Sequence, residues 1–269
     1  MRIWWQSFVD PHESPAYFEQ LAAHLRELAH ETTTVDVVGL TPPDRSFGRL
    51  TELRCAVLAV DNALEAAERG YDAFAFGHFQ DPGLYEARSA VDIPVTGLGE
   101  ATLHWAAQLG RRLALVSIDP VFDVWHREQA DLYGLGGRIS HVVGLGALVE
   151  DFAPAFAGDD AARSRLLARF RELAEPLVAD GADVIVPAGA LPALLLAGEH
   201  GAAVGRAPVV NSVAVLLKCT EAAVELRRLT GLGPGRGPSF APAPPQAVAD
   251  FRSLLADGRS PARPGDGES

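Results

Sequence analysis

The sequence predicts an α/β protein of two pseudo-symmetric lobes, each with a mainly parallel sheet flanked by helices. Two observations predict this fold class. Along most of the 269 residues, short apolar segments of strand length alternate with longer amphipathic ones, which is typical of parallel α/β sheets. Segments of similar sequence also recur at a spacing of about 110 residues. Because ligands of open α/β sheets bind beyond the carboxyl ends of the strands, we expect the active site in the cleft between the lobes.

The first part of the chain supplies four expected strands, at 3–9, 34–40, 72–77 and 93–96. Apolar residues at helical spacing predict a helix over 14–29, and a second helix over 49–69 ends at Gly70. Asp81 followed by Pro82 predicts the N-cap and first position of the next helix.

The second part continues the alternation with strands at 113–118, 139–143, 184–186 and 209–210. Beyond Gly231 the composition becomes rich in Pro and Gly. We therefore expect 231–269 to be a partly disordered C-terminal extension, with one short helix at 247–255 and disorder over 258–269.

An internal repeat predicts the domain organisation. Arg2 matches Arg112 at an offset of 112 − 2 = 110, Gly70 matches Gly181 at 111, and Pro94 matches Pro208 at 114. The alternative explanation for these matches is the general similarity of any two α/β units. The repeat predicts a first lobe of 1–110 plus 208–230 and a second lobe of 111–207.

Composition excludes several classes of function. Lys+Arg 23 against Asp+Glu 35 gives a net charge of −12, which argues against nucleic acid as a partner. No apolar run reaches the roughly 18 residues of a membrane span, and the N-terminus has no signal-peptide pattern. Cys55 and Cys219 cannot form a disulfide framework, so we expect a reducing cytoplasm. The eight histidines show no HxH or HxxxH pair, so no metal site is expected.

Four segments carry a resemblance to a known family: GHFQDPGL at 77–84, VDIPVTGLGEA at 91–101, GADVIV at 181–186 and APVVNSVA at 207–214. Over about residues 1–230 the chain resembles the aspartate/glutamate racemase superfamily, and within it the hydantoin racemase branch. The resemblance implies two pseudo-symmetric α/β lobes and chemistry without a cofactor at a carbon next to a carboxyl or carbonyl group. It also implies a small carboxylate, amide or hydantoin-like substrate and a homo-oligomer.

The chain departs from this family at the two positions that carry the chemistry. Such racemases use one cysteine from each lobe, on opposite faces of the substrate carbon. The first of these positions is His78 here, and the second falls on Gly189. The repeat supports this placement, because 78 + 111 = 189. Cys55 and Cys219 both lie in expected helices as small buried residues and do not replace the missing thiols.

His78 is the candidate catalytic residue, since an imidazole with a reference pKa of about 6.5 can accept and donate a proton near neutral pH. A histidine that only hydrogen-bonds its own loop is the alternative. The backbone amides of Phe79, Gln80 and Ala190, with Gly189 beside them, could hold a carboxylate or an oxyanion; a plain tight turn would give the same pattern.

Further polar residues at expected strand ends are candidates for substrate binding, with ordinary turn or cap roles as the alternative: Gln6, Ser7, Ser117, Asn211 and Ser212. A base for the second face could come from Glu100, His104, Asp119 or His126. Of the adjacent Trp4 and Trp5, we expect one in the core and the other lining the cleft.

These features favour a cofactor-independent isomerase or racemase-like enzyme with His78 as its single acid and base. A lyase on the same scaffold, by decarboxylation or elimination, is the first alternative. A ligand-binding homologue that has lost its thiols is the second.

Overall fold

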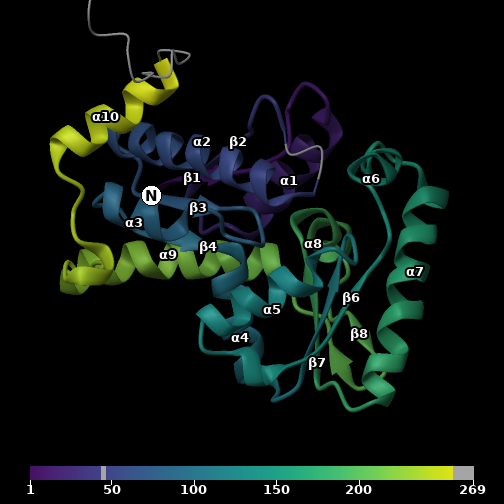
Figure 1. Cartoon of the computed structure of the whole chain (residues 1–269). Helices are drawn as coiled ribbons and strands as arrows, with labels where there is room; N and C mark the ends of the chain where they lie inside the picture. The colour runs from purple at the N-terminus through teal and green to yellow at the C-terminus, as the bar shows by residue number, and fades with distance from the viewer. Residues whose placement is uncertain (44–46, 257–269) are drawn as a thin grey trace, which may run out of the picture.

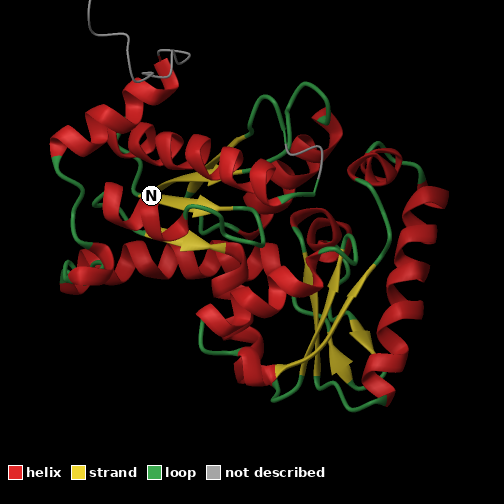
Figure 2. Cartoon of the chain, in the orientation of Figure 1, coloured by secondary structure: helices red, strands yellow, loops and turns green. Residues whose placement is uncertain are grey.

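The computed structural model describes residues 1–43 and 47–256. Two sheets with parallel strands lie side by side, and helices pack against both (Figures 1 and 2). The predicted α/β class, with parallel sheets flanked by helices, is confirmed.

The first sheet has the strand order β2-β1-β3-β4, and every pair is parallel. Its strands are β1 (Arg2–Gln6), β2 (Thr34–Val38), β3 (Ala73–Phe76) and β4 (Val95–Gly97). Both faces of the sheet are covered, which is why β3 is apolar at every position. On β1, Trp4 contributes to the core on one face, whereas Ile3 and Trp5 contribute to the core on the other.

Helices cover the two faces of this sheet. The face of Trp5 packs against α1 (Pro15–Leu28), α4 (Leu98–Leu109) and α9 (Ser212–Thr230). The face of Trp4 packs against α2 (Arg49–Glu68) and α3 (Leu84–Ala90). Over that second core lies α10 (Pro245–Ala256), through Val248 and Phe251. The expected disorder over 258–269 lies outside the described residues.

The second sheet has the order β6-β5-β7. Its strands are β5 (Leu113–Ser117), β6 (Ile139–Gly144) and β7 (Val184–Ala188). The helices around it are α5 (Phe122–Leu132), α6 (Val149–Phe156), α7 (Asp160–Ala179) and α8 (Ala190–Ala197), and short 3₁₀ turns lie at η1 (Gly136–Arg138) and, in the C-terminal segment, η2 (Pro238–Phe240).

The strand expected at 209–210 is reduced to one bridge. Val209 pairs in parallel with Ile185, while the preceding residues form β9 (Ala207–Pro208) in a hairpin with β8 (Ala203–Val204). Pro208 has no N–H to donate to a ladder, which limits pairing at this point.

The internal repeat reappears in the contacts. The order β2-β1-β3 corresponds to β6-β5-β7. In each half an aspartate two residues after a glycine of positive φ accepts a hydrogen bond from a backbone N–H at the start of β1 or just before β5: Asp72 from Arg2 at 2.7 Å and Asp183 from Arg112 at 3.0 Å. The lobe boundaries at 110, 208 and 230 stay predictions, since α4 and α9 pack against elements of both halves.

Asp81 does not cap the next helix, contrary to expectation. Its backbone has φ +52° and Gly83 has φ +87°, so the chain turns and the Asp81 side chain points into the protein. There its carboxylate accepts the N–H groups of Gly99 at 3.1 Å and Glu100 at 2.7 Å. The residue caps α4, because a buried carboxylate needs donors that only the tertiary fold supplies.

Candidate active site

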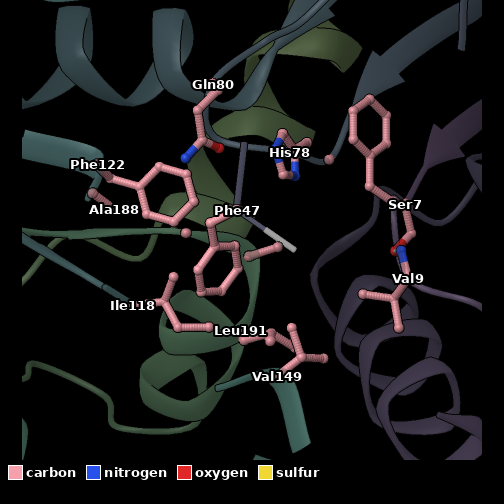
Figure 3. Close-up of a pocket in the computed structure, with 14 residues that line it drawn as sticks. Ser7, Val9, Phe47, His78, Gln80, Ile118, Phe122, Val149, Ala188 and Leu191 are labelled. Atoms are coloured by element: carbon pink, nitrogen blue, oxygen red, sulfur yellow. The ribbon is translucent and has the colours of Figure 1, made fainter. Parts of the chain in front are cut away.

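The carboxyl ends of four strands meet at one cavity. Ser7 follows β1, His78 comes two residues after the end of β3, Ile118 follows β5, and Gly189 follows β7. The space between them has about 540 Å³ that protein atoms do not fill, a volume that includes open solvent at the mouth. Figure 3 shows its lining, which is completed by Phe8, Val9, Phe47, Gly77, Gln80, Phe122, Val149, Ala188, Ala190 and Leu191. Parallel strands therefore deliver residues of both lobes to a single site.

His78 is held on two sides. Its ring stacks on Phe8, with centroids 4.4 Å apart and planes at 18°. Its Nε2 lies 3.0 Å from Oε1 of Glu52, and the two side chains are only 17% and 10% exposed. The imidazole therefore has a defined orientation at the wall of the cavity.

Glu52 is a functional candidate that the sequence analysis missed. It lies in the first turn of α2, on the same buried side as Cys55, Ala59 and Ala63. The sequence contains a signal for this role, since Glu52 is a charged residue at helical spacing on an otherwise apolar side of the helix. A carboxylate buried on that side needs a partner.

The polar side chains among the described lining residues, Ser7, His78 and Gln80, all come from the first lobe. The Ser7 hydroxyl also accepts the N–H of Val9 at 3.3 Å. Among the described lining residues, only His78 has an ionisable side chain.

The wall contributed by the second lobe is apolar. It presents Ile118, Phe122, Ala188, Gly189, Ala190, Val149 and Leu191, and in Figure 3 Val149 and Leu191 lie across the cavity from His78 and Gln80. Gly189 precedes α8, so the first two N–H groups of that helix, at Ala190 and Leu191, have no partner within it. These two groups can receive negative charge.

The structure thus brings Ser7, His78, Gln80, Gly189 and Ala190 together. Five other candidates do not line this cavity within the described ranges: Gln6, Phe79, Ser117, Asn211 and Ser212.

Each of these five side chains, or its backbone, has another contact. The amide of Gln6 donates to the carbonyl of Ser7 at 2.8 Å, and the carbonyl of Phe79 accepts from Gln129. Ser117 lies against the buried His126 at 3.0 Å. Asn211 caps α9, and Ser212 is fully buried.

None of the four candidates for a second base lines the described part of the cavity. Glu100 pairs with Arg88, Asp119 accepts the N–H of Val121 at 2.8 Å, and His104 is exposed. Burial lowers the pKa of His126 to about 4, so this histidine stays neutral at neutral pH.

The expectation that one tryptophan lines the cleft is wrong. Trp4 is 2% exposed and Trp5 is 1% exposed, and both belong to cores. Trp5 instead lies directly beneath Gly77, where a Cβ would stand 2.2 Å from its Nε1. The backbone at Gly77 can therefore lie this close to the indole of Trp5 only because residue 77 has no side chain.

Helix α5 of the second sheet holds the loop that carries His78. Gln129 donates to the Phe79 carbonyl at 2.5 Å, and the Tyr133 hydroxyl donates to Oδ2 of Asp81 at 2.8 Å. Burial raises the pKa of Asp81 to about 7, although backbone N–H donors and Tyr133 act in the opposite direction.

Neither a metal-binding cluster nor a membrane-spanning helix is found in the described portion of the chain. It contains no group of three or more His, Cys, Asp or Glu residues that could hold a metal ion. It also contains no helix that is both long and apolar enough to span a bilayer.

Comparison with known proteins relates this site to one family. A family model described as "Asp/Glu/Hydantoin racemase" matches residues 8–220. A hydantoin racemase of Pseudomonas sp. (strain NS671) is 30% identical over 83 residues, which are 31% of this chain and 33% of that protein. The matched segments span a third to about a half of the curated relatives, 33% and 48%.

Solved structures show the same fold. An allantoin racemase from Klebsiella pneumoniae superposes with a TM-score of 0.74 at 24% identity, covering 90% of this chain and 94% of that one. An arylmalonate decarboxylase superposes with a TM-score of 0.53 at 17% identity, covering 89% and 99%.

Proposed function

Because the chain belongs to the Asp/Glu/hydantoin racemase family, we propose that it catalyses cofactor-independent proton transfer at a carbon next to a carbonyl or carboxyl group. In this proposal His78 is the single acid and base, in the position where the family has its first cysteine. Gly189 takes the position of the second cysteine.

One observation carries the proposal: among the described residues that line the cavity, His78 alone has an ionisable side chain, and it lies on one wall only. His78 comes from the first lobe, whereas the described second-lobe wall is apolar around Gly189. An imidazole can remove a proton from carbon and return one without the activation that a thiol requires.

The opposite wall offers stabilisation of the intermediate. When His78 takes a proton from the substrate carbon, the bonding electrons move toward the adjacent carbonyl and leave an enolate oxygen. The N–H groups of Ala190 and Leu191, at the start of α8, and the side-chain amide of Gln80 are donors at the cavity for that oxygen. Return of the proton from the imidazolium to carbon restores neutral His78.

The lining favours a neutral or weakly charged substrate with an apolar part. No Lys or Arg stands among its described residues, while Phe8, Phe47 and Phe122 do. A ring carbonyl of a hydantoin-like compound can be bound by N–H donors alone, whereas a free carboxylate is bound best by a cation. The names of the similar proteins, hydantoin racemase and allantoin racemase, agree with such a cyclic substrate.

A lyase is the second candidate, and the one-sided placement of His78 favours it specifically. A single acid can protonate a carbanion on one face after loss of carbon dioxide, which does not require a base on the other face. The fold shared with an arylmalonate decarboxylase supports this alternative. A non-catalytic ligand-binding homologue is the third, and a homo-oligomer remains our expectation for the assembly.

Exchange in heavy water tests the proposal. The protein is incubated with 5-benzylhydantoin, allantoin or phenylmalonate, and deuterium at the α-carbon is followed by NMR against an enzyme-free blank. We expect His78→Asn to slow enzymatic exchange by about 10²–10⁴-fold, and the exposed-site control His104→Asn to leave it unchanged.

The outcomes separate the candidates. Exchange without loss of carbon dioxide supports the isomerase, and release of carbon dioxide from phenylmalonate with deuterium in the product supports the lyase. Exchange at the wild-type rate in His78→Asn rules out His78 as the base. Tight binding of these compounds with no exchange would leave the binding protein.

A further inference from the structure

Glu52 is a buried carboxylate with one strong contact. Its side chain is 10% exposed, and its Oε1 lies 3.0 Å from Nε2 of His78. Its Oε2 is buried and has no hydrogen-bond partner in the part of the chain that the structure describes. Burying an ionised carboxylate is costly unless it is paired, so the contact with His78 is what makes Glu52 tolerable here.

The contact determines which ring nitrogen of His78 carries a hydrogen. An ionised carboxylate only accepts hydrogen bonds, so Nε2 must be the donor in both the neutral and the charged imidazole. The nitrogen that gains and loses a proton is then Nδ1. The stacked Phe8 ring restricts the plane of the imidazole, which helps to keep Nε2 facing Glu52.

From this geometry we propose that Glu52 is the positioning residue of the site: it holds His78 as the Nε2–H tautomer and leaves Nδ1 to exchange the proton with the substrate carbon. The inference rests on the proposed function of His78. No proton passes to Glu52. As the acceptor of the Nε2 hydrogen, Glu52 faces the imidazolium that forms when Nδ1 takes the proton from carbon, so it stabilises the charged state of the reaction.

Among the described residues, the other charged groups around the pair do not replace Glu52. His126 interacts electrostatically with both Glu52 and His78, but its pKa of about 4 keeps it uncharged near neutral pH. On another side Glu52 borders a second cavity whose charged lining residues are Arg49, Asp81, Glu86 and Glu128. Arg49 there is paired with Glu128 at 2.5 Å, so no described basic residue other than His78 pairs with Glu52.

The test combines a tautomer measurement with kinetics on the full chain. In protein labelled with ¹⁵N-histidine, two-bond ¹H–¹⁵N spectra report which ring nitrogen carries hydrogen, and comparison with His78→Asn identifies the signals of His78. The variants are Glu52→Gln, which removes the charge at constant size, and Glu52→Asp, which keeps it on a shorter arm. Glu86→Gln is the matched control, since it removes a carboxylate at the second cavity without touching His78.

We expect wild-type His78 to be the Nε2–H tautomer. Glu52→Gln should slow α-carbon exchange about 100-fold through kcat with KM unchanged, shift the tautomer population, and move the acidic limb of the pH profile to lower pH. Glu52→Asp should recover part of the rate, and Glu86→Gln should match the wild type.

Failure of the inference differs from failure of the proposed function. An Nδ1–H tautomer in the wild type, which needs no variant to fold, overturns the role of Glu52. The role of Glu52 is also overturned if Glu52→Gln keeps the wild-type rate, pH profile and tautomer while His78→Asn is inactive. In that case the proposed function stands. A wild-type rate in His78→Asn overturns the proposed function and, with it, the catalytic role of Glu52, whatever the tautomer.

Discussion

Gly77→Ala tests the close approach between the strand that leads to His78 and the indole of Trp5. A Cβ at position 77 would stand 2.2 Å from Nε1 of Trp5 and 2.9 Å from its Cδ1 and Cε2. Ordinary contact begins at 3.4 Å, so the two groups must separate by about 3.4 − 2.2 = 1.2 Å. Trp5 is 1% exposed and cannot swing toward solvent. The strain must therefore be taken up by the core or by the backbone that carries His78.

Overpacking of this kind costs about 1–3 kcal/mol, and each kcal/mol lowers the Tm of a chain of this size by about 2–4 °C. We expect Gly77→Ala to lower the Tm by about 2–12 °C in a thermal melt followed by circular dichroism. Gly137→Ala is the control, because nothing lies within 4 Å of a Cβ there.

A double-mutant cycle isolates the contact. Trp5→Phe removes Nε1, so the cost of Gly77→Ala should be smaller in that background by about 1–2 kcal/mol. If Gly77→Ala melts within 1 °C of the wild type, as Gly137→Ala should, or if the two substitutions at 5 and 77 are additive, the reasoning about this contact is refuted.

Three further predictions follow from the site. The pKa of Asp81, raised to about 7, means that the folded state holds a proton that the unfolded state has lost between about pH 4 and 7. The contribution of Asp81 to the free energy of unfolding therefore falls as pH rises through that window, by up to about 4 kcal/mol. In urea titrations at pH 4, 5.5 and 7, Asp81→Asn should abolish this dependence of stability on pH. An unchanged pH dependence in the variant would contradict the raised pKa of Asp81. His126, with its pKa lowered to about 4, acts in the opposite sense, so its contribution to stability is lost as pH falls from about 6.5 to 4. The ¹⁵N shifts of His126 should remain those of a neutral ring at pH 5. An imidazolium signal at that pH would show that burial does not control the pKa of His126. Gly189→Cys places a Cβ 3.1 Å from Cγ of Pro192 at φ +158°, and we expect a cost of about 1–2 kcal/mol in unfolding titrations, equal to that of the matched Gly189→Ala. Only the thiol variant should gain racemisation of 5-benzylhydantoin by chiral chromatography, and equal rates in both would argue against a base on that face.

The parts of the site that could be predicted are those that depend on strand ends. His78 and Gly189 lie 111 residues apart in equivalent places of a repeat, and the carboxyl ends of parallel strands meet by topology. Ser7, Gln80 and Ala190 reached the same cavity for the same reason. Gln6 did not, since neighbouring residues of a strand point to opposite faces and a shift of one residue reverses the side chain.

Contacts between distant segments could not be predicted in the same way. Glu52 meets His78 across 26 residues, and Asp81 caps a helix that begins 17 residues later, at Leu98. The local signal at Asp81 and Pro82 was a helix start, but burial of the carboxylate among the N–H groups of α4 outweighed it. Trp5 likewise packed into the core because covered sheets bury both faces of a strand.

The sequence by itself determined the α/β class and the repeat of two parallel sheets, since hydrophobic periodicity and residue identity are local properties. The tertiary structure alone decided which side chains face the cavity, that Glu52 holds His78, and that α5 ties down the loop carrying it. Those features depend on the distances in space between segments that only packing brings together. Hydrogen bonds act over about 3 Å, and the number of residues between two segments does not show whether they come that close.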